Sequence, residues 1–97
     1  MHVITRKRLN EFAEKYPETR TALANWYDLV RSNDFSSLPN LKLMFPTADQ
    51  VGKLTVFNVG GNNYRIITVV FYEAQRVYIA EVLTHEEYNK DSWKERL

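Results

Sequence analysis

The sequence predicts an α+β fold, with helices in the first half of the chain and an antiparallel sheet in the second. Apolar residues recur at helical spacing near the N-terminus, whereas three segments rich in β-branched and aromatic residues follow one another after residue 53. Segregated helices and strands are typical of α+β domains. A chain of 97 residues is long enough for one core, so we expect a single domain over residues 1–97.

Two helices are expected before residue 32. The first has an apolar face at a spacing of three to four residues, formed by Leu9, Phe12, Ala13 and Tyr16. Thr5 precedes this helix and is expected to be its N-cap. The second helix is expected to start at Pro17, because a proline in the first turn costs no hydrogen bond. Its apolar residues are Ala22, Leu23, Trp26, Tyr27 and Val30.

The segment from Arg31 to Gln50 mixes small polar residues and two prolines with large apolar residues. We expect an irregular connection that packs on the core. Three strands then follow, at Leu54 to Val59, Tyr64 to Tyr72 and Val77 to Leu83. Short turns separate them, so an antiparallel meander is predicted. The second strand is apolar on both faces between Ile66 and Phe71, which places it in the middle of the sheet, with helices covering at least one face.

A capping box follows the last strand, with Thr84 as the N-cap and Glu87 as its partner. A short C-terminal helix is therefore expected to begin here. His85 and Tyr88 are three residues apart, so they lie close to one face of that helix, at the end of the sheet. Two groups that can transfer protons are thus predicted side by side.

The composition excludes several classes of site. There is no cysteine, which excludes disulfides and thiolate chemistry and favours a reducing compartment, so we expect a cytoplasmic protein. The formal net charge is only +1, so binding to nucleic acid requires local clustering of cations. No apolar stretch approaches the length of a membrane span. His2 and His85 lie at opposite ends of the sequence, and neither a protein-bound metal nor a cofactor is expected.

The remaining Arg, Lys, His and Tyr residues suit one metal-free reaction, the attack of an RNA 2′-hydroxyl on its own phosphodiester. This step needs a base, an acid and cations that stabilise the charged transition state. His85 can act as acid or base, Tyr88 can donate a proton or stack on a base, and Arg65 can bind a phosphate. Each also has a structural alternative: a solvated histidine, a core aromatic residue and an arginine that reaches water from an edge.

Other polar residues are less distinctive. Lys42 and Lys53 flank the corner at Phe45, and lone lysines such as these commonly lie on the plain surface. Asn62, like Asn58 and Asn63, is expected to serve the turn through hydrogen bonds to the backbone, with contact to an RNA base as the second interpretation.

Three motifs together resemble the HigB-type toxins. Residues 56–67, Val-Phe-Asn-Val-Gly-Gly-Asn-Asn-Tyr-Arg-Ile-Ile, are similar to the family signature F-N-[IV]-G-G-N-x-Y-R-[LI]. Residues 84–88 resemble its T-H-x-E-Y-[DN] motif, and residues 41–49 its [VL]-K-x-x-F-P-[ST]-A-D stretch. The chain departs from many relatives at Asn89, where aspartate is common, and at Leu83, where glycine is common.

The resemblance implies a RelE-like fold, with two N-terminal helices packed on a small antiparallel sheet. It also implies an mRNA interferase, the toxin of a type II toxin-antitoxin system, which cuts mRNA on the translating ribosome without a metal. A cognate HigA-type helix-turn-helix antitoxin would neutralise it. Arg65 would bind the scissile phosphate, His85 and Tyr88 would share the acid and base roles, and Lys42 and Lys53 would add positive charge.

Two other functions remain open at the level of the sequence. The first is an RNA- or ribosome-binding module that blocks translation without cleavage, in which Tyr88 stacks on a base and Arg65 clamps a phosphate. The second is a protein-interaction domain in which Trp26 and Trp93 contact the partner.

Overall fold

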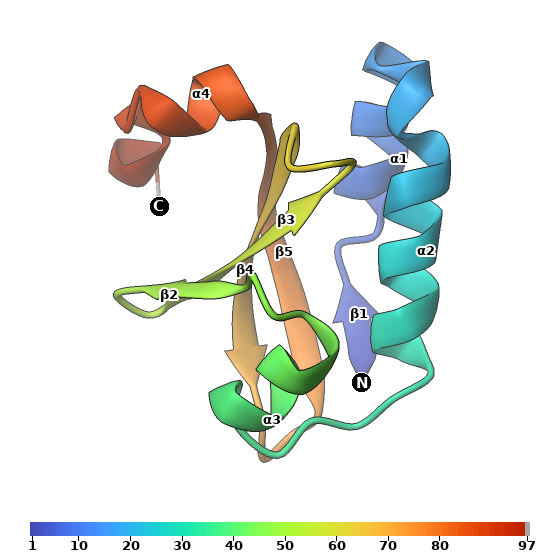
Figure 1. The fold of residues 1–97 in the computed structure, drawn as a ribbon, viewed down its shortest axis with the longest axis vertical. Coiled ribbons are helices and arrows are strands. Elements are labelled where there is room, and N and C mark those ends of the chain that lie inside the picture. Colours follow the sequence, from blue (N-terminus) through green and yellow to red (C-terminus); the bar gives the residue numbers. More distant parts are fainter. Residues whose placement is uncertain (97) are drawn as a thin grey trace.

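A five-stranded mixed sheet forms the centre of the computed structural model, which describes residues 1–96 (Figure 1). The strand order is β1-β5-β4-β3-β2. The predicted meander is confirmed as three consecutive antiparallel strands, and β4 lies in the middle of the sheet as predicted. The strands are β1 (His2–Ile4), β2 (Asp49–Val51), β3 (Leu54–Val59), β4 (Tyr64–Phe71) and β5 (Arg76–Thr84).

The predicted sheet lacked two strands. β1 pairs in parallel with β5, so the sheet is mixed rather than antiparallel throughout, and β2 pairs with β3 at the other edge. Each of these strands has only three residues. Such a length is too short to show the alternation of apolar and polar residues by which strands are recognised.

Thr5 is not the N-cap of the first helix, which corrects the prediction. Its backbone has a positive φ of 69°. Its hydroxyl group donates to the Ile79 carbonyl at 2.8 Å and accepts from the Ile79 amide at 3.0 Å. Thr5 therefore prolongs the contact between β1 and β5. The N-cap is Arg6, without a side-chain hydrogen bond.

Helices α1 (Lys7–Lys15) and α2 (Arg20–Arg31) lie side by side along one face of the sheet (Figure 1). Pro17 begins a 3-10 turn, η1 (Pro17–Thr19), that leads directly into α2. Trp26 of α2 is buried and meets Phe57 of β3 edge to face, with ring centroids 5.3 Å apart. Trp26 and Trp93 are both fully enclosed, so neither can serve as the surface contact that the protein-interaction interpretation requires. Among the described residues, no helix has the length and apolar character needed to cross a membrane.

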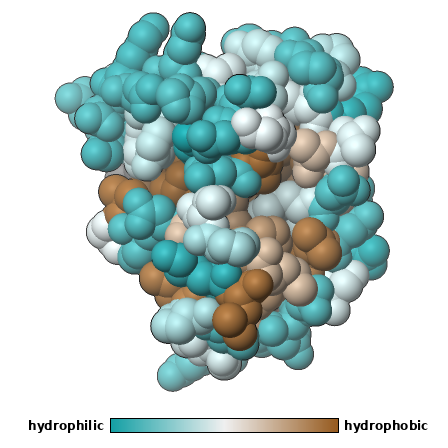
Figure 2. All heavy atoms as spheres, in the orientation of Figure 1, coloured by the Kyte–Doolittle hydropathy of each residue, from teal (hydrophilic) through white to brown (hydrophobic). Residues whose placement is uncertain are grey.

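The connection from residue 31 to residue 50 is not irregular throughout, which corrects the expectation from its composition. It contains β2 and a third helix, α3 (Leu38–Met44). Ser37 is the N-cap of α3 and accepts a hydrogen bond from the Asn40 amide. Leu41 packs into the core, whereas Leu43 and Met44 are exposed, and Figure 2 shows hydrophobic side chains over this part of the molecule.

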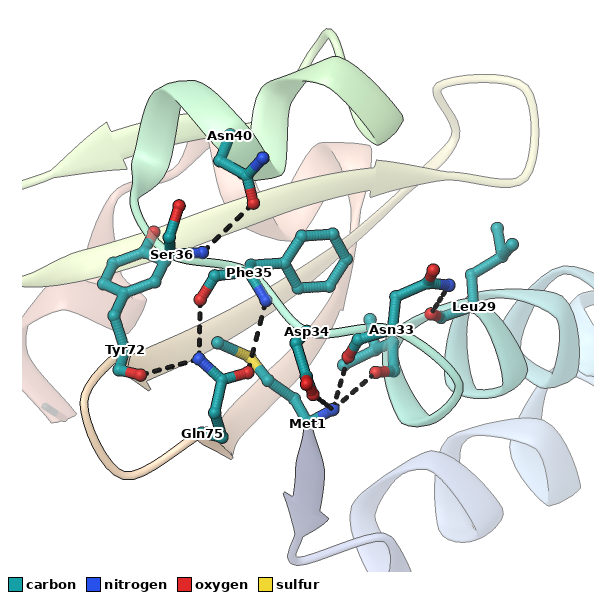
Figure 3. Close-up of polar contacts among 10 residues, drawn as sticks. Met1, Leu29, Asn33, Asp34, Phe35, Ser36, Asn40, Tyr72 and Gln75 are labelled. Atoms are coloured by element: carbon teal, nitrogen blue, oxygen red, sulfur yellow. Dashed lines mark hydrogen bonds and ion pairs between the residues drawn. The ribbon is translucent and has the colours of Figure 1, made fainter.

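Gln75, in the turn between β4 and β5, fastens the segment that leads into α3 (Figure 3). Its side-chain oxygen accepts from the Phe35 amide at 3.2 Å, and its nitrogen donates to the Phe35 carbonyl at 2.7 Å. The same nitrogen donates to the Tyr72 carbonyl. At the other end of the segment, the Met1 amine donates to the Asn33 carbonyl (Figure 3). These contacts hold the segment before α3 against the turn between β4 and β5 and against the N-terminus.

The opposite face of the sheet carries a smaller apolar cluster around Val56, Ile67, Leu83 and Trp93. It is covered near the upper end of the sheet by α4 (His85–Asn89) and by η2 (Ser92–Arg96) (Figure 1). The capping box is confirmed: the Thr84 amide donates to the Glu87 carboxylate, and the Glu87 amide donates to the Thr84 hydroxyl. It starts α4 at His85, as predicted.

We predict that Gln75→Ala lowers the free energy of unfolding by about 2 kcal/mol, because the half-buried amide and carbonyl of Phe35 lose their partner. Urea unfolding followed by circular dichroism would measure this. Glu73→Ala is the matched control, since Glu73 is exposed in the same turn, and it should change stability by less than about 0.5 kcal/mol. Equal effects of the two substitutions would contradict the assigned role of Gln75.

Candidate functional site

The turn between β3 and β4 is the local structure on which the site is built. Gly60, Gly61 and Asn62 all have positive φ, a conformation that glycine and asparagine adopt most readily. At Gly60 a Cβ atom would also lie 2.7 Å from the ring of Tyr64, so no larger residue fits. The Gly-Gly-Asn sequence of the motif is therefore explained by the left-handed backbone of the turn and by the close approach of Tyr64.

Backbone carbonyls of this turn position two of the predicted site residues. The Arg65 guanidinium donates to the Asn62 carbonyl at 2.9 Å and, at the start of β4, to the Tyr64 carbonyl at 3.1 Å. The His85 amide donates to the Asn63 carbonyl at 2.8 Å, which joins α4 to a turn far earlier in the chain. One short turn thus holds the side chain of Arg65 and the backbone of His85 at the same end of the sheet.

Arg65 lines a pocket of about 310 Å³ between α3, β2, β3, β4 and α4. Lys42 of α3 and Tyr88 of α4 line the same pocket, so the structure brings together three of the predicted site residues. Residues from five separate elements meet here, because Asp49 of β2 also lines the pocket. The remaining residues of the lining are Pro46, Thr47, Ala48, Asp49, Val56 and Asn58.

The environment of Arg65 suits an anion. The residue is 7% exposed, and within residues 1–96 no carboxylate lies within ion-pair distance of its guanidinium. Both of its hydrogen bonds to the protein come from Nη1. A buried cation without a counter-ion is costly, and an arginine whose remaining N–H groups are free can bind a phosphate through two of them. The pocket therefore offers a negatively charged group two cations, Arg65 and Lys42, against one carboxylate, Asp49.

Tyr88 is held against the sheet by Trp93. The two rings stack with centroids 5.2 Å apart and planes 18° apart, and the Trp93 indole N–H donates to the Tyr88 carbonyl at 2.9 Å. The Arg65 guanidinium carbon lies 5.3 Å from the centre of the Tyr88 ring, within the range of a cation–π interaction. Arg96 fixes η2 to β5 through a hydrogen bond to Glu81, and this carboxylate raises the pKa of Arg96.

His85 begins α4 but does not line the pocket around Arg65. Its side chain is exposed, and the Asn89 amide nitrogen lies 3.1 Å from its Nδ1. Asn89 thus contacts the imidazole ring of His85 one turn along α4.

The other two predicted residues lie elsewhere. Lys53 follows β2 and lines a different pocket, toward the opposite end of the sheet. Asn62 has an exposed side chain, and what it gives to the site is the carbonyl that accepts from Arg65. Within residues 1–96, no group of three histidine, aspartate or glutamate side chains could hold a metal ion.

Two polar residues of the pocket, Asn58 and Asp49, were not predicted from the sequence. Asn58 was assigned to the turn, but it pairs with Arg65 across the β3–β4 ladder, and its amide donates to the Thr47 carbonyl at 3.4 Å. The register that follows from a turn at residues 60–63 places Asn58 opposite Arg65, so this neighbour could have been found. Asp49 ends the motif at residues 41–49, but no role followed for it because β2, the strand that carries it, was not recognised.

Comparison with known proteins agrees with the motifs. Residues 19–91 match the model of the HigB toxin family, described as the RelE-like toxic component of a toxin-antitoxin system. The chain is 44% identical over 92 residues to the mRNA interferase toxin HigB of Escherichia coli K12, which covers 92% of this chain and 88% of that protein. A HigB of E. coli O6:H1, also named an mRNA interferase, is 33% identical over 93 residues, or 93% of this chain and 90% of that protein. This chain belongs to the HigB toxin family.

Proposed function

We propose that this protein is an mRNA interferase, the toxin of a toxin-antitoxin system, and that the pocket around Arg65 binds the scissile phosphate. The observation that carries the proposal is the buried Arg65 guanidinium, which has no carboxylate partner within residues 1–96 and lies against Tyr88. Lys42 adds a second cation to the same pocket. The relatives named above are mRNA interferases, which agrees with an RNA phosphate as the anion.

The reaction needs only groups of the protein and the RNA. A base takes the proton of the 2′-hydroxyl, the 2′-oxygen forms a bond to phosphorus, and the bond from phosphorus to the 5′-oxygen breaks. An acid then donates a proton to that leaving oxygen, which leaves a 2′,3′-cyclic phosphate and a free 5′-hydroxyl. Arg65 and Lys42 stabilise the negative charge that develops on the phosphate oxygens. His85 and Tyr88 share the acid and base roles.

The cellular partners follow from this role. We propose that the substrate is mRNA on the translating ribosome in the cytoplasm, and that a HigA-type helix-turn-helix antitoxin neutralises the toxin. We also propose a RelE-like fold, which the α1–α2 pair, the β3–β4–β5 meander and the family match support. Binding to the ribosome without cleavage is the alternative, since Tyr88 and Arg65 can equally stack on a base and clamp a phosphate.

We predict that Arg65→Ala and His85→Ala each lower the rate of mRNA cleavage by about 10²- to 10⁴-fold, because each removes charge stabilisation or proton transfer. Primer extension in a reconstituted translation reaction would measure this through new 5′ ends. Arg31→Ala is the matched control, because Arg31 is an exposed cation on α2, across the sheet from the pocket. It should cleave at the wild-type rate. Thermal unfolding checks that each variant is folded.

Three results would contradict the assignment. Wild-type rates in the double variant Arg65→Ala/His85→Ala would exclude this site. Translation arrest by the wild type without new 5′ ends would favour the non-cleaving alternative. A cleavage rate that stays constant between about pH 5 and 8 would exclude an acid or base role for His85.

A second prediction concerns Trp93 as a positioning residue for Tyr88. Trp93→Phe keeps an aromatic ring for stacking but removes the indole N–H that donates to the Tyr88 carbonyl. We expect kcat to fall about tenfold with little change in KM. A displaced Tyr88 reduces the stabilisation of the transition state more than it reduces the affinity for RNA. Trp93→Ala should lower the free energy of unfolding by about 3 to 5 kcal/mol.

Trp26→Phe provides the control for this prediction. Trp26 is as deeply buried as Trp93, but its indole nitrogen has no hydrogen-bond partner within residues 1–96. The substitution therefore removes a similar volume without removing a hydrogen bond, on the face of the sheet away from the pocket. It should leave cleavage by the folded protein unchanged. An equal loss of kcat in both variants would mean that Trp93 acts only through stability.

A further inference from the structure

A second and larger pocket, of about 750 Å³, lies on the part of the sheet that α4 and η2 leave uncovered. It is formed near the turn between β4 and β5, at the end of the sheet opposite α4 (Figure 1). Its apolar residues include Val69, Ala74 and Tyr78. Phe71 is 50% exposed there and meets Tyr78 edge to face, with ring centroids 5.4 Å apart. An exposed aromatic residue within an apolar hollow marks a surface suited to a protein partner.

Two cations also line this pocket, Lys53 from the turn after β2 and Arg76 from the start of β5. Both are exposed, and neither forms an ion pair within residues 1–96. Arg76 is directly opposite Phe71 in the β4–β5 ladder. The surface therefore combines an apolar hollow with two cations that form no ion pair within residues 1–96. A partner that fits it would carry both apolar side chains and carboxylates.

We propose that this surface, called here the Phe71 groove, binds an acidic amphipathic segment of the antitoxin. Apolar side chains of that segment would pack on Phe71 and Tyr78, and its carboxylates would pair with Lys53 and Arg76. This proposal rests on the toxin role proposed above, which supplies an antitoxin as the partner. The charge complementarity selects this occupant.

Two other occupants fit less well. In a symmetric dimer formed by two copies of the groove, the same patch faces itself, which brings Lys53 and Arg76 of both copies close together. Such like-charge contacts are unfavourable. RNA would find cations here, but much of the hollow is aliphatic and offers no hydrogen bonds to base edges. A protein segment that carries both apolar and acidic side chains satisfies both features.

The Phe71 groove can be tested separately from the phosphate pocket. Arg65 and Phe71 lie near opposite ends of β4, and six residues of extended strand span about 20 Å. Substitutions in the groove therefore leave the groups around Arg65 in place.

The experiment measures binding of the separately purified cognate antitoxin to the full-length toxin by isothermal titration calorimetry, and its kinetics by surface plasmon resonance. Phe71→Ser and Arg76→Glu should each raise the dissociation constant at least about tenfold. For Arg76→Glu, the association rate should also become less sensitive to salt. Arg31→Glu is the matched control, because it makes the same change in net charge on α2, and it should bind like the wild type.

Cleavage of translated mRNA without antitoxin is measured for the same variants and should remain at the wild-type rate. Failure of the wild type to cleave would overturn the proposed function, whereas unchanged antitoxin affinity in both groove variants would overturn the groove proposal alone. Lower cleavage with unchanged antitoxin affinity would assign the groove to RNA. A wild-type dimer in sedimentation velocity that Phe71→Ser dissociates, with antitoxin affinity unchanged, would assign it to self-association.

Discussion

The left-handed turn at residues 60–63 is the constraint on which the candidate site depends. The chain reverses within four residues through a positive φ at Gly60. Glycine suits this position because a Cβ atom there would lie too close to the Tyr64 ring. The reversal presents the Asn62 carbonyl to the Arg65 guanidinium and the Asn63 carbonyl to the His85 amide. A side chain of β4 and the first turn of α4 are thereby fixed to the same few backbone atoms.

The packing around Tyr88 helps to offset the free-energy cost of burying the Arg65 guanidinium. Removing a cation from water without a counter-ion costs several kcal/mol, and its hydrogen bonds to the Asn62 and Tyr64 carbonyls offset only part of this. The Tyr88 ring provides a further favourable contact, but only while its orientation is fixed. Trp93 fixes it by stacking, and the ion pair of Arg96 with Glu81 holds the segment that carries Trp93. The C-terminal segment thus contributes to the electrostatics of the site.

The sequence was informative where the determinants of structure are local. The β3–β4–β5 meander and the capping box at Thr84 depend on alternation, turn residues and contacts three residues apart, and all were predicted. β1 and the role of Thr5 depend on partners far along the chain, such as Ile79, and were missed. β2 pairs with the adjacent β3 and was missed because it has only three residues. The same distinction applies to the site. Motifs contained Arg65, Tyr88 and Asp49, but only the fold showed that all three line one pocket.

The two ends of β4 have different chemistry because the sheet is covered at one end only. At the start of the strand, Tyr88 of α4 and the segment from Lys42 to Asp49 surround Arg65 and leave a small polar pocket. At its end nothing within residues 1–96 covers Phe71, and the surface is broad and apolar. A partner bound to Phe71 would leave the Arg65 pocket open to a phosphate. Neutralisation through this groove would then leave the site of cleavage itself unfilled.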